Sequence, residues 1–452
     1  MKSIRIGTGQ GYWGDRLDAP LALVDRGRVQ YICFDYLAEL TMSILQKQKE
    51  RDPSKGYAHD FVTLCRQILP RVRKQGIRLI ASAGGVNPRG CAEAIAQVAR
   101  GHGLTVKIAT VEGDNILDRL DSLAAQGYAL KNMDDGSGIG AIRDRITSAN
   151  VYLGVAPVIE ALRGGADIVI TGRNTDTSLF LAPMIHEFGW RMDELDKLAC
   201  GICIGHVIEC GAQVTGGNYT GGWDRVPDLA RVGWPIAEVS EDGSAVITKP
   251  DGTGGLVEAG TVKEELLYEI GDPGNYITPD VVADFRPVRI EDAGPDRVKL
   301  WGAKGRPAPD TLKVSISYRN GYRAFADLGF SWPRALEKAK LAAKILAERF
   351  RIVGLQAEEV LFDYIGYNSL HGPLAEFPGH DPQEVRLRVG IRTRTAEEAR
   401  KLGPEVPCLV TCGPPQGGGY SARATPQEIL EYWPALIPVA AIRPEVHFVE
   451  VR

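Results

Sequence analysis

Short apolar runs that alternate with helical patterns constrain the fold of this 452-residue chain most strongly. Within residues 1–215, helix-like segments such as 35–49 and 88–100 separate these runs. The runs lie at 4–6, 30–34, 78–81, 106–111 and 166–171. Apolar strands separated by helices are typical of a parallel sheet covered on both faces. The pattern predicts an α/β fold with a mostly parallel, doubly wound sheet.

Two further regions follow, and each has a different character. Residues 216–310 contain the loop-forming stretches "TGGNYTGGW" and "KPDGTGGLV" and predict a β- and loop-rich extension. Residues 311–452 predict an α+β domain, for which a ferredoxin-like topology is one candidate. Its expected elements are strand 312–318, a turn at Asn320–Gly321, strand 322–328, helix 332–350, strands 358–364 and 384–392, and helix 395–402. We therefore expect domains at 1–215, 216–310 and 311–452.

Charge and cysteine usage narrow the class of protein. The 53 Lys and Arg against 57 Asp and Glu give a net charge of -4, and no basic cluster indicates nucleic acid or an anionic membrane as partner. The eight cysteines are scattered, as in proteins of a reducing compartment. No run approaches the ~18 apolar residues that span a bilayer, and "MKSIRIG" has no secretion signal. We expect a soluble cytoplasmic protein.

The stretch "IGTGQGYWGDR", residues 6–16, allows two interpretations. Its glycines have the G-x-G-x-x-G spacing of a dinucleotide-binding turn: Gly9, Gly11 and Gly14. Asp35 follows where a ribose-binding carboxylate is expected, which favours a nicotinamide or flavin cofactor. Pro20, however, interrupts the helix that such a turn requires. The favoured interpretation is a tight loop without cofactor that presents Asp15 and Arg16 for substrate binding.

Small and polar residues follow each of the five predicted strands. In open parallel sheets ligands bind beyond the carboxyl ends of the strands. The residues at these ends are Asp15 and Arg16, Asp35 and Glu39, Ser82, Gly84, Gly85 and Asn87, Glu112, Gly113 and Asp114, and Thr171, Gly172, Arg173 and Asp176. The pattern predicts one shared pocket, and the alternative is a set of separate solvated turns.

The residue types in this pocket suggest acid–base chemistry. Arg173 is suited to hold a carboxylate or phosphate, and the amides of "AGG" and "TGR" are suited to bind an anion. Glu112, Asp114 or Asp176 would act as general acid or base if burial raises its pKa. The plainer alternative is that Arg173 and Asp176 only pair with each other at the start of a helix.

Other candidates lie outside these turns. The stretch "CIGHVIECGAQVTGGN" places three reactive side chains on one face of a helix: His206, Glu209 and Cys210. Together they could bind a metal ion or act as catalytic groups. The alternative is that they only pack in the protein core. We take His206 and Glu209 as further catalytic candidates and expect no structural metal site, without excluding a metal. Lys249 precedes a glycine-rich loop and is placed to reach a phosphate, or is a solvated hairpin lysine. Residues 411–420 are predicted to form a loop or a lid.

Several long motifs resemble, in order, those of the acyclic terpene utilisation AtuA family. They include "GTGQGYWGDR", "SAGGVNP", "GADIVITGRNTDTSL", "GHVIECGAQVTGGNY" and "LLYEIGDPGNYITPDV". The resemblance implies a role in the catabolism of citronellol- and geraniol-type isoprenoids through CoA thioesters, without an established reaction. Family members often carry an additional small ferredoxin-like domain at the C-terminus, and the resemblance implies that this domain is either absent here or supplied by a separate partner chain.

These observations support three hypotheses. The first is a hydratase- or lyase-type enzyme that acts on a small branched carboxylic acid or its CoA thioester. In this hypothesis Arg173 anchors the acyl group, and Glu112 or Asp176 moves the proton. Asn87 and glycine amides stabilise the negative charge of an enolate. The second is a non-catalytic subunit that binds an acyl intermediate. The third is a nicotinamide- or flavin-dependent oxidoreductase. A homo-oligomer is compatible with all three.

Overall fold

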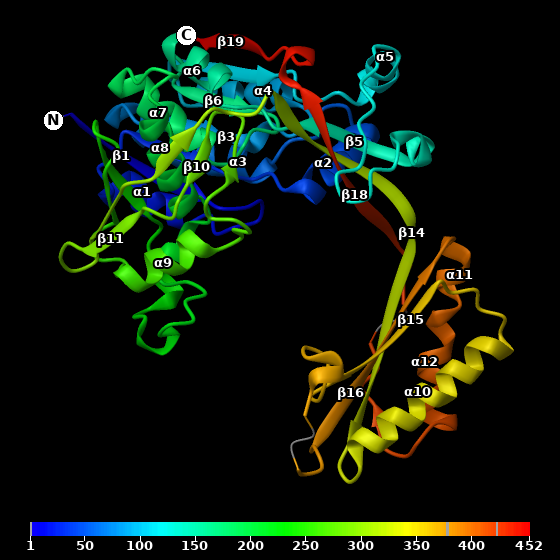
Figure 1. Ribbon diagram of the computed structural model, residues 1–452. Helices are drawn as coiled ribbons and strands as arrows, with labels where there is room; N and C mark the ends of the chain where they lie inside the picture. The colour runs from blue at the N-terminus through cyan, green and yellow to red at the C-terminus, as the bar shows by residue number, and fades with distance from the viewer. Residues whose placement is uncertain (1, 377–378, 422–423) are drawn as a thin grey trace. The chain divides into compact units, whose positions relative to one another are not determined.

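The computed structural model describes residues 2–376, 379–421 and 424–452, and the chain forms two compact units (Figure 1). The larger unit consists of Met1–Ser317 and Tyr432–Arg452, and the smaller of Tyr318–Glu431. Residues 216–310, which the sequence analysis separates from 1–215, share the larger unit with them. The boundaries expected at 215 and 310 stay predictions.

A ten-stranded sheet forms the centre of the larger unit, and five adjacent strands in it are parallel. In spatial order these are β1 (Ser3–Gln10), β2 (Tyr31–Phe34), β3 (Arg78–Ala81), β6 (Ile168–Thr171) and β4 (Val106–Glu112). They are short and almost entirely buried. The apolar runs of the first 215 residues therefore do form parallel strands, because a strand covered on both faces needs apolar side chains on both.

The whole sheet is mixed rather than mostly parallel, which corrects the expectation. Antiparallel strands continue it beyond β1 in the order β7 (Ile236–Ser240), β8 (Ala245–Thr248), β12 (Val298–Trp301) and β11 (Arg289–Asp292). At the other edge β19 (Glu445–Val451) pairs with β4. Hairpin strands from the loop-rich region thus join the sheet of the first 215 residues, a long-range pairing that local sequence does not specify.

Two groups of helices pack on this sheet. One group is α1 (Ala19–Arg26), α3 (His59–Gln75) and α4 (Pro88–Gly101), and the other is α6 (Ala156–Arg163), α7 (Ser178–Phe188) and α8 (Leu195–Glu209). Every residue of α8 from Leu198 to Glu209 is buried, as expected for a helix that is apolar all round. No helix in the described part of the chain is long and apolar enough to cross a membrane.

The smaller unit packs helices on one face of an antiparallel sheet ordered β15-β16-β14-β17. Its elements are β14 (Thr311–Ser331), α10 (Ala335–Ile352), β15 (Glu359–Ile365), β16 (Glu384–Thr393), α11 (Ala396–Arg400), α12 (Leu402–Cys412) and β17 (Gly417–Gly418). β14 begins in the larger unit, and β18 (Gln427–Pro438) returns the chain to it.

The turn predicted at Asn320–Gly321 is wrong, because β14 runs straight through these residues. An Asn-Gly turn would pair residues 312–318 with 322–328, but Tyr322–Ser331 pairs with β16 instead. Gly321 is still required there. Its φ is 87°, and a Cβ would lie 2.4 Å from the carbonyl oxygen of Thr393.

Candidate active site

A cavity of about 610 Å³ in the larger unit gathers residues from five parts of the chain. Its lining comes from the turn after β1, the segment after β2, the turn after β6, and the ends of α8 and α9 (Ala259–Leu267). The principal residues are Gly11, Tyr12, Trp13, Asp35, Leu37, Glu39, Arg173, Asp176, Glu209, Cys210, Gln213, Tyr268 and Glu269. Three of the five strand ends singled out from the sequence therefore do meet.

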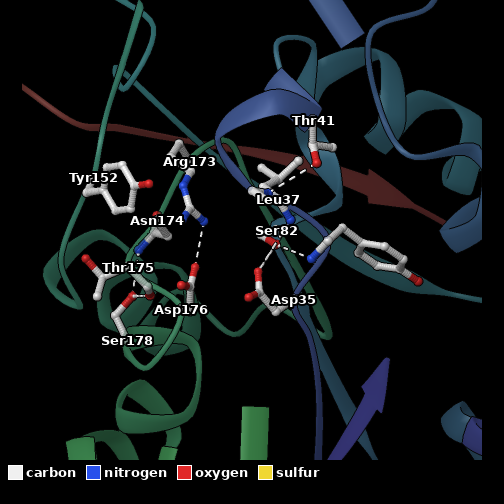
Figure 2. Close-up of polar contacts among 12 residues, drawn as sticks. Asp35, Leu37, Thr41, Ser82, Tyr152, Arg173, Asn174, Thr175, Asp176 and Ser178 are labelled. Carbon is white, nitrogen blue, oxygen red and sulfur yellow. Dashed lines mark hydrogen bonds and ion pairs between the residues drawn. The ribbon is translucent and has the colours of Figure 1, made fainter. Parts of the chain in front are cut away.

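Arg173, after β6, is a deeply enclosed charged side chain of the cavity lining. Its side chain is 3% exposed, and its Nη1 donates to Oδ1 of Asp176 at 2.6 Å. The guanidinium lies over the ring of Tyr152, 4.1 Å from the ring centre, while Nε has no partner. Figure 2 shows Arg173 between Tyr152 and Asp176. Asp176 and the Tyr152 ring therefore hold the guanidinium against the wall of the cavity.

Asp114, after β4, supports this turn from behind. Its Oδ2 accepts hydrogen bonds from the backbone N–H of Arg173 at 2.8 Å and from Nδ2 of Asn150 at 2.9 Å. A Cβ on Gly172 would lie 2.3 Å from the Asp114 carboxylate, so only glycine fits between them. Asp114 does not line the cavity, but it sets the backbone position of the residue that does.

Asp35, after β2, faces the Arg173–Asp176 pair from the opposite wall (Figure 2). Its Oδ1 accepts a hydrogen bond from Oγ of Ser82, the residue after β3, at 3.0 Å. Burial, together with the nearby charge of Asp176, raises the pKa of Asp35 well above its usual range. The Asp35 carboxyl therefore retains its proton at a pH where an exposed aspartate has lost it.

Glu209, at the end of α8, is the second carboxyl with this property. Burial and the charge of Asp176 raise its pKa well above the usual range. Its Oε1 lies 3.2 Å from Nδ1 of His206, whose own pKa is lowered by burial. His206 packs against Tyr276 and Phe285 behind the wall of the cavity. The predicted pair thus does assemble, with Glu209 lining the cavity and His206 behind it.

The charge balance of the cavity is strongly acidic. Five carboxyl groups line it against a single guanidinium. The five are Asp35, Glu39, Asp176, Glu209 and Glu269. Within the described residues, no group of three or more His, Cys, Asp or Glu side chains is arranged to hold a metal ion. Burial raises the pKa of two of the five carboxyls, Asp35 and Glu209, so these two retain protons that exposed carboxyls would lose.

Most of the remaining sequence candidates have local partners away from the cavity. Glu112 pairs with Arg89 at 2.7 Å, and Lys249 with Asp296 at 2.9 Å. Arg16 pairs with Asp18 and covers the ring of Trp234. Their proposed roles in substrate binding or catalysis stay predictions.

The "AGG" part of the predicted anion nest and the neighbouring Asn87 are not part of the cavity lining. Asn87 caps α4 by accepting from the N–H of Gly90 at 3.1 Å. A Cβ on Gly84 would lie 2.6 Å from the carbonyl oxygen of Thr171, and one on Gly85 2.6 Å from that of Gly56. These glycines are therefore explained by close backbone packing.

The opening glycine turn lacks the helix of a dinucleotide-binding turn. A Cβ on Gly9 would lie 2.1 Å from the ring of Phe34, and one on Gly11 2.9 Å from the backbone of Cys210. Gly14 has a φ of 99°. The next helix, α1, begins only at Ala19. Asp15 closes the turn by accepting from the N–H groups of Gly11 at 3.0 Å and Arg16 at 2.7 Å.

Four residues of the site were missed by sequence reasoning. Tyr152 supports Arg173 and donates to Oε1 of Glu39 at 2.7 Å. Glu265 lies beside the cavity, where burial raises its pKa to about 7. Tyr268 and Glu269 line the cavity. The last two belong to the "LLYEIGDP" motif and follow helix α9, so a search for polar residues after strands does not find them.

The pKa of Asp114, which burial raises to about 6, leads to a prediction about stability. Because the folded state holds this proton more tightly than the unfolded state, stability should fall as pH rises from about 4 to about 6. The shift from 3.8 corresponds to roughly 3 kcal/mol. Asp114→Asn should lack this part of the decline when unfolding is measured from pH 4 to 7. Asp121→Asn, at a side chain 83% exposed, should keep it. Parallel curves for Asp114→Asn and the unaltered protein would contradict the assignment.

A family model described as "Acyclic terpene utilisation family protein AtuA" matches residues 4–448. No curated protein and no solved structure matches the chain at a significant level.

Proposed function

We propose an enzymatic function for this chain, which belongs to the acyclic terpene utilisation AtuA family. It catalyses the addition or removal of water on a small branched, isoprenoid-derived carboxylic acid or its CoA thioester. The observation that carries the proposal is the composition of the cavity, in which carboxyls with raised pKa face one enclosed guanidinium.

The carboxyl pair of Asp35 and Asp176 supports acid–base catalysis. Asp35 holds a proton because of its burial and the neighbouring negative charge. Asp176 accepts an ion-paired hydrogen bond from Arg173. A protonated and a charge-paired carboxyl side by side are suited to serve as general acid and general base on one substrate.

Each step of such a reaction balances without a further reagent. In dehydration, Asp35 gives its proton to the departing hydroxyl group, the C–O bond breaks, and water leaves. Asp176 accepts a proton from the adjacent carbon, whose C–H electron pair forms the double bond. Hydration is the reverse. The two carboxyls then return to their starting states by exchanging a proton with each other or with solvent.

The rest of the lining favours a branched carbon as the reacting centre. Positive charge that develops at such a carbon is stabilised by carboxylates and by the faces of aromatic rings. Tyr12, Trp13 and Tyr268 supply apolar and aromatic surface. Arg173, the single cation among the described residues of the lining, is suited to attract the acyl carboxylate or thioester oxygen. The enolate route finds less support, because its expected amide donors lie outside the lining.

The purified protein incubated with isoprenoid-derived acids and their CoA thioesters tests this function. A gain or loss of one water, measured by mass spectrometry, is the expected result. Retention of a compound without a change of mass would replace the proposal with an acyl-binding subunit. Loss of two hydrogens with added nicotinamide or flavin would replace it with an oxidoreductase.

We also propose finer features of the architecture and setting. The helix groups on the large sheet support a doubly wound arrangement of its parallel part. The smaller unit follows the order β-α-β-β-α-β with the sheet order β15-β16-β14-β17, which supports a ferredoxin-like topology. A cytoplasmic location and a homo-oligomeric state are proposals that rest on the sequence alone.

A further inference from the structure

We propose that a second pocket, on the surface between α3 and α4, binds a phosphate group. This α3–α4 pocket has a volume of about 480 Å³. Four of its lining side chains are cationic or become so on protonation, and its lining contains no carboxylate. The four are Lys55, His59, Arg66 and His102. In a chain of net charge -4, such a gathering of basic side chains in a lining without carboxylates indicates an anionic ligand.

The two permanent cations of the α3–α4 pocket are not engaged by protein carboxylates. Other arginines of α3 are paired, Arg71 with Asp25 and Arg73 with Asp167. For Lys55 and Arg66, no carboxylate of the described residues lies within ion-pair distance. An unpaired guanidinium and ammonium on one pocket are suited to a phosphate, which offers several oxygen acceptors at once.

Two carboxylates act on the α3–α4 pocket from outside its lining. Asp52 and Asp60 both influence His59 electrostatically, and Asp52 also influences Lys55. Oδ1 of Asp52 is already occupied by hydrogen bonds from the backbone N–H and the hydroxyl of Ser54. The two carboxylates therefore weaken the positive potential of the α3–α4 pocket, but neither of them occupies the pocket.

His59 adds a hydrogen-bonding group that the protein leaves unused. Its Nε2 is buried and has no partner, and its ring packs on Tyr57 with 4.5 Å between ring centres. Burial and the nearby Lys55 lower the pKa of His59, so the ring is neutral near pH 7. His59 is also the first residue of the 17-residue helix α3, where the partial positive charge of the helix terminus favours an anion.

The size of the α3–α4 pocket favours a phosphate carried by a larger molecule. A free phosphate ion fills only a small part of 480 Å³, whereas a nucleotide phosphate would use more of it. The 3′-phosphate of coenzyme A has this chemistry, and inorganic phosphate shares it. This inference does not rest on the reaction proposed for the first cavity, since no residue is common to the two linings.

Calorimetric titration of the full chain tests the α3–α4 pocket. The probes are inorganic phosphate, coenzyme A and 3′-dephospho-coenzyme A. The double variant Lys55→Gln/Arg66→Gln should weaken binding by about tenfold or more, because two charge-assisted contacts are lost. Lys74→Gln changes one exposed charge near the end of the same helix and should bind within about twofold of the unaltered protein.

The outcomes separate the two sources of phosphate. Tighter binding of coenzyme A than of its 3′-dephospho form, lost in the double variant, identifies a nucleotide 3′-phosphate. Binding of inorganic phosphate with no preference between the two coenzymes, also lost in the double variant, identifies free phosphate. No saturable binding of any probe, or equal binding by the double variant, overturns the proposal. Neither result bears on the mass-spectrometric test of the first cavity.

Discussion

Replacing Asp35 by Asn should reduce turnover by about a thousandfold while the protein stays folded. Asn keeps the size of the side chain and can still accept the hydrogen bond from Ser82, but it cannot give up or take back a proton. The expected effect falls on kcat more than on KM, because the proton moves in the transition state. The measurement is the water-addition or water-loss assay with the first compound that the mass-spectrometric panel identifies.

Two further variants make the Asp35 result specific. Asp121→Asn removes an exposed carboxylate of the larger unit and should retain full turnover. Glu209→Gln tests the other buried carboxyl, and a loss as large as that of Asp35→Asn would move the role of proton donor to Glu209. Unchanged turnover in both Asp35→Asn and Glu209→Gln would remove the basis of the proposed chemistry.

Replacing Arg173 by Ala should lower the free energy of unfolding by about 3 kcal/mol. The substitution removes a side chain that is 3% exposed and leaves Asp176, 34% exposed, without its cation beside Asp35. It also removes the contact with the Tyr152 ring at 4.1 Å. Chemical unfolding at pH 7, followed by circular dichroism, is the measurement.

An exposed ion pair provides the matched control for Arg173. Arg71 and Asp25 are 2.6 Å apart, with side chains 41% and 47% exposed. Arg71→Ala should cost less than about 1 kcal/mol, because solvent screens such a pair. Equal losses for Arg71→Ala and Arg173→Ala would contradict the structural role of the buried pair. If the larger loss is found, inactivity of Arg173→Ala cannot be read as evidence of substrate binding, so Asp35→Asn is the better probe of the chemistry.

The sequence pattern predicted many helices and strands correctly, because a strand that is buried on both faces consists almost entirely of apolar residues. The apolar runs at 78–81 and 106–111 coincide with β3 (Arg78–Ala81) and most of β4 (Val106–Glu112), and the helix expected at 88–100 is α4 (Pro88–Gly101). The Asn320–Gly321 turn was mispredicted because turn propensity is overruled when the flanking residues pair with other strands.

For the site, sequence determined which residue types follow the strands, and the tertiary structure decided which of them meet. The Asp, Arg and Gly residues after β1, β2 and β6 could be identified because strand ends in a parallel sheet share one edge. Only the order of the strands in the folded sheet shows that β6 lies between β3 and β4. Because β4 and β6 are neighbours, Asp114 after β4 lies behind Arg173 after β6. Only packing could bring Glu209 from α8 and Tyr268 from the end of α9 into the same cavity. Burial then raises the pKa values that make these carboxyls acids, and burial arises from contacts between residues far apart in the chain.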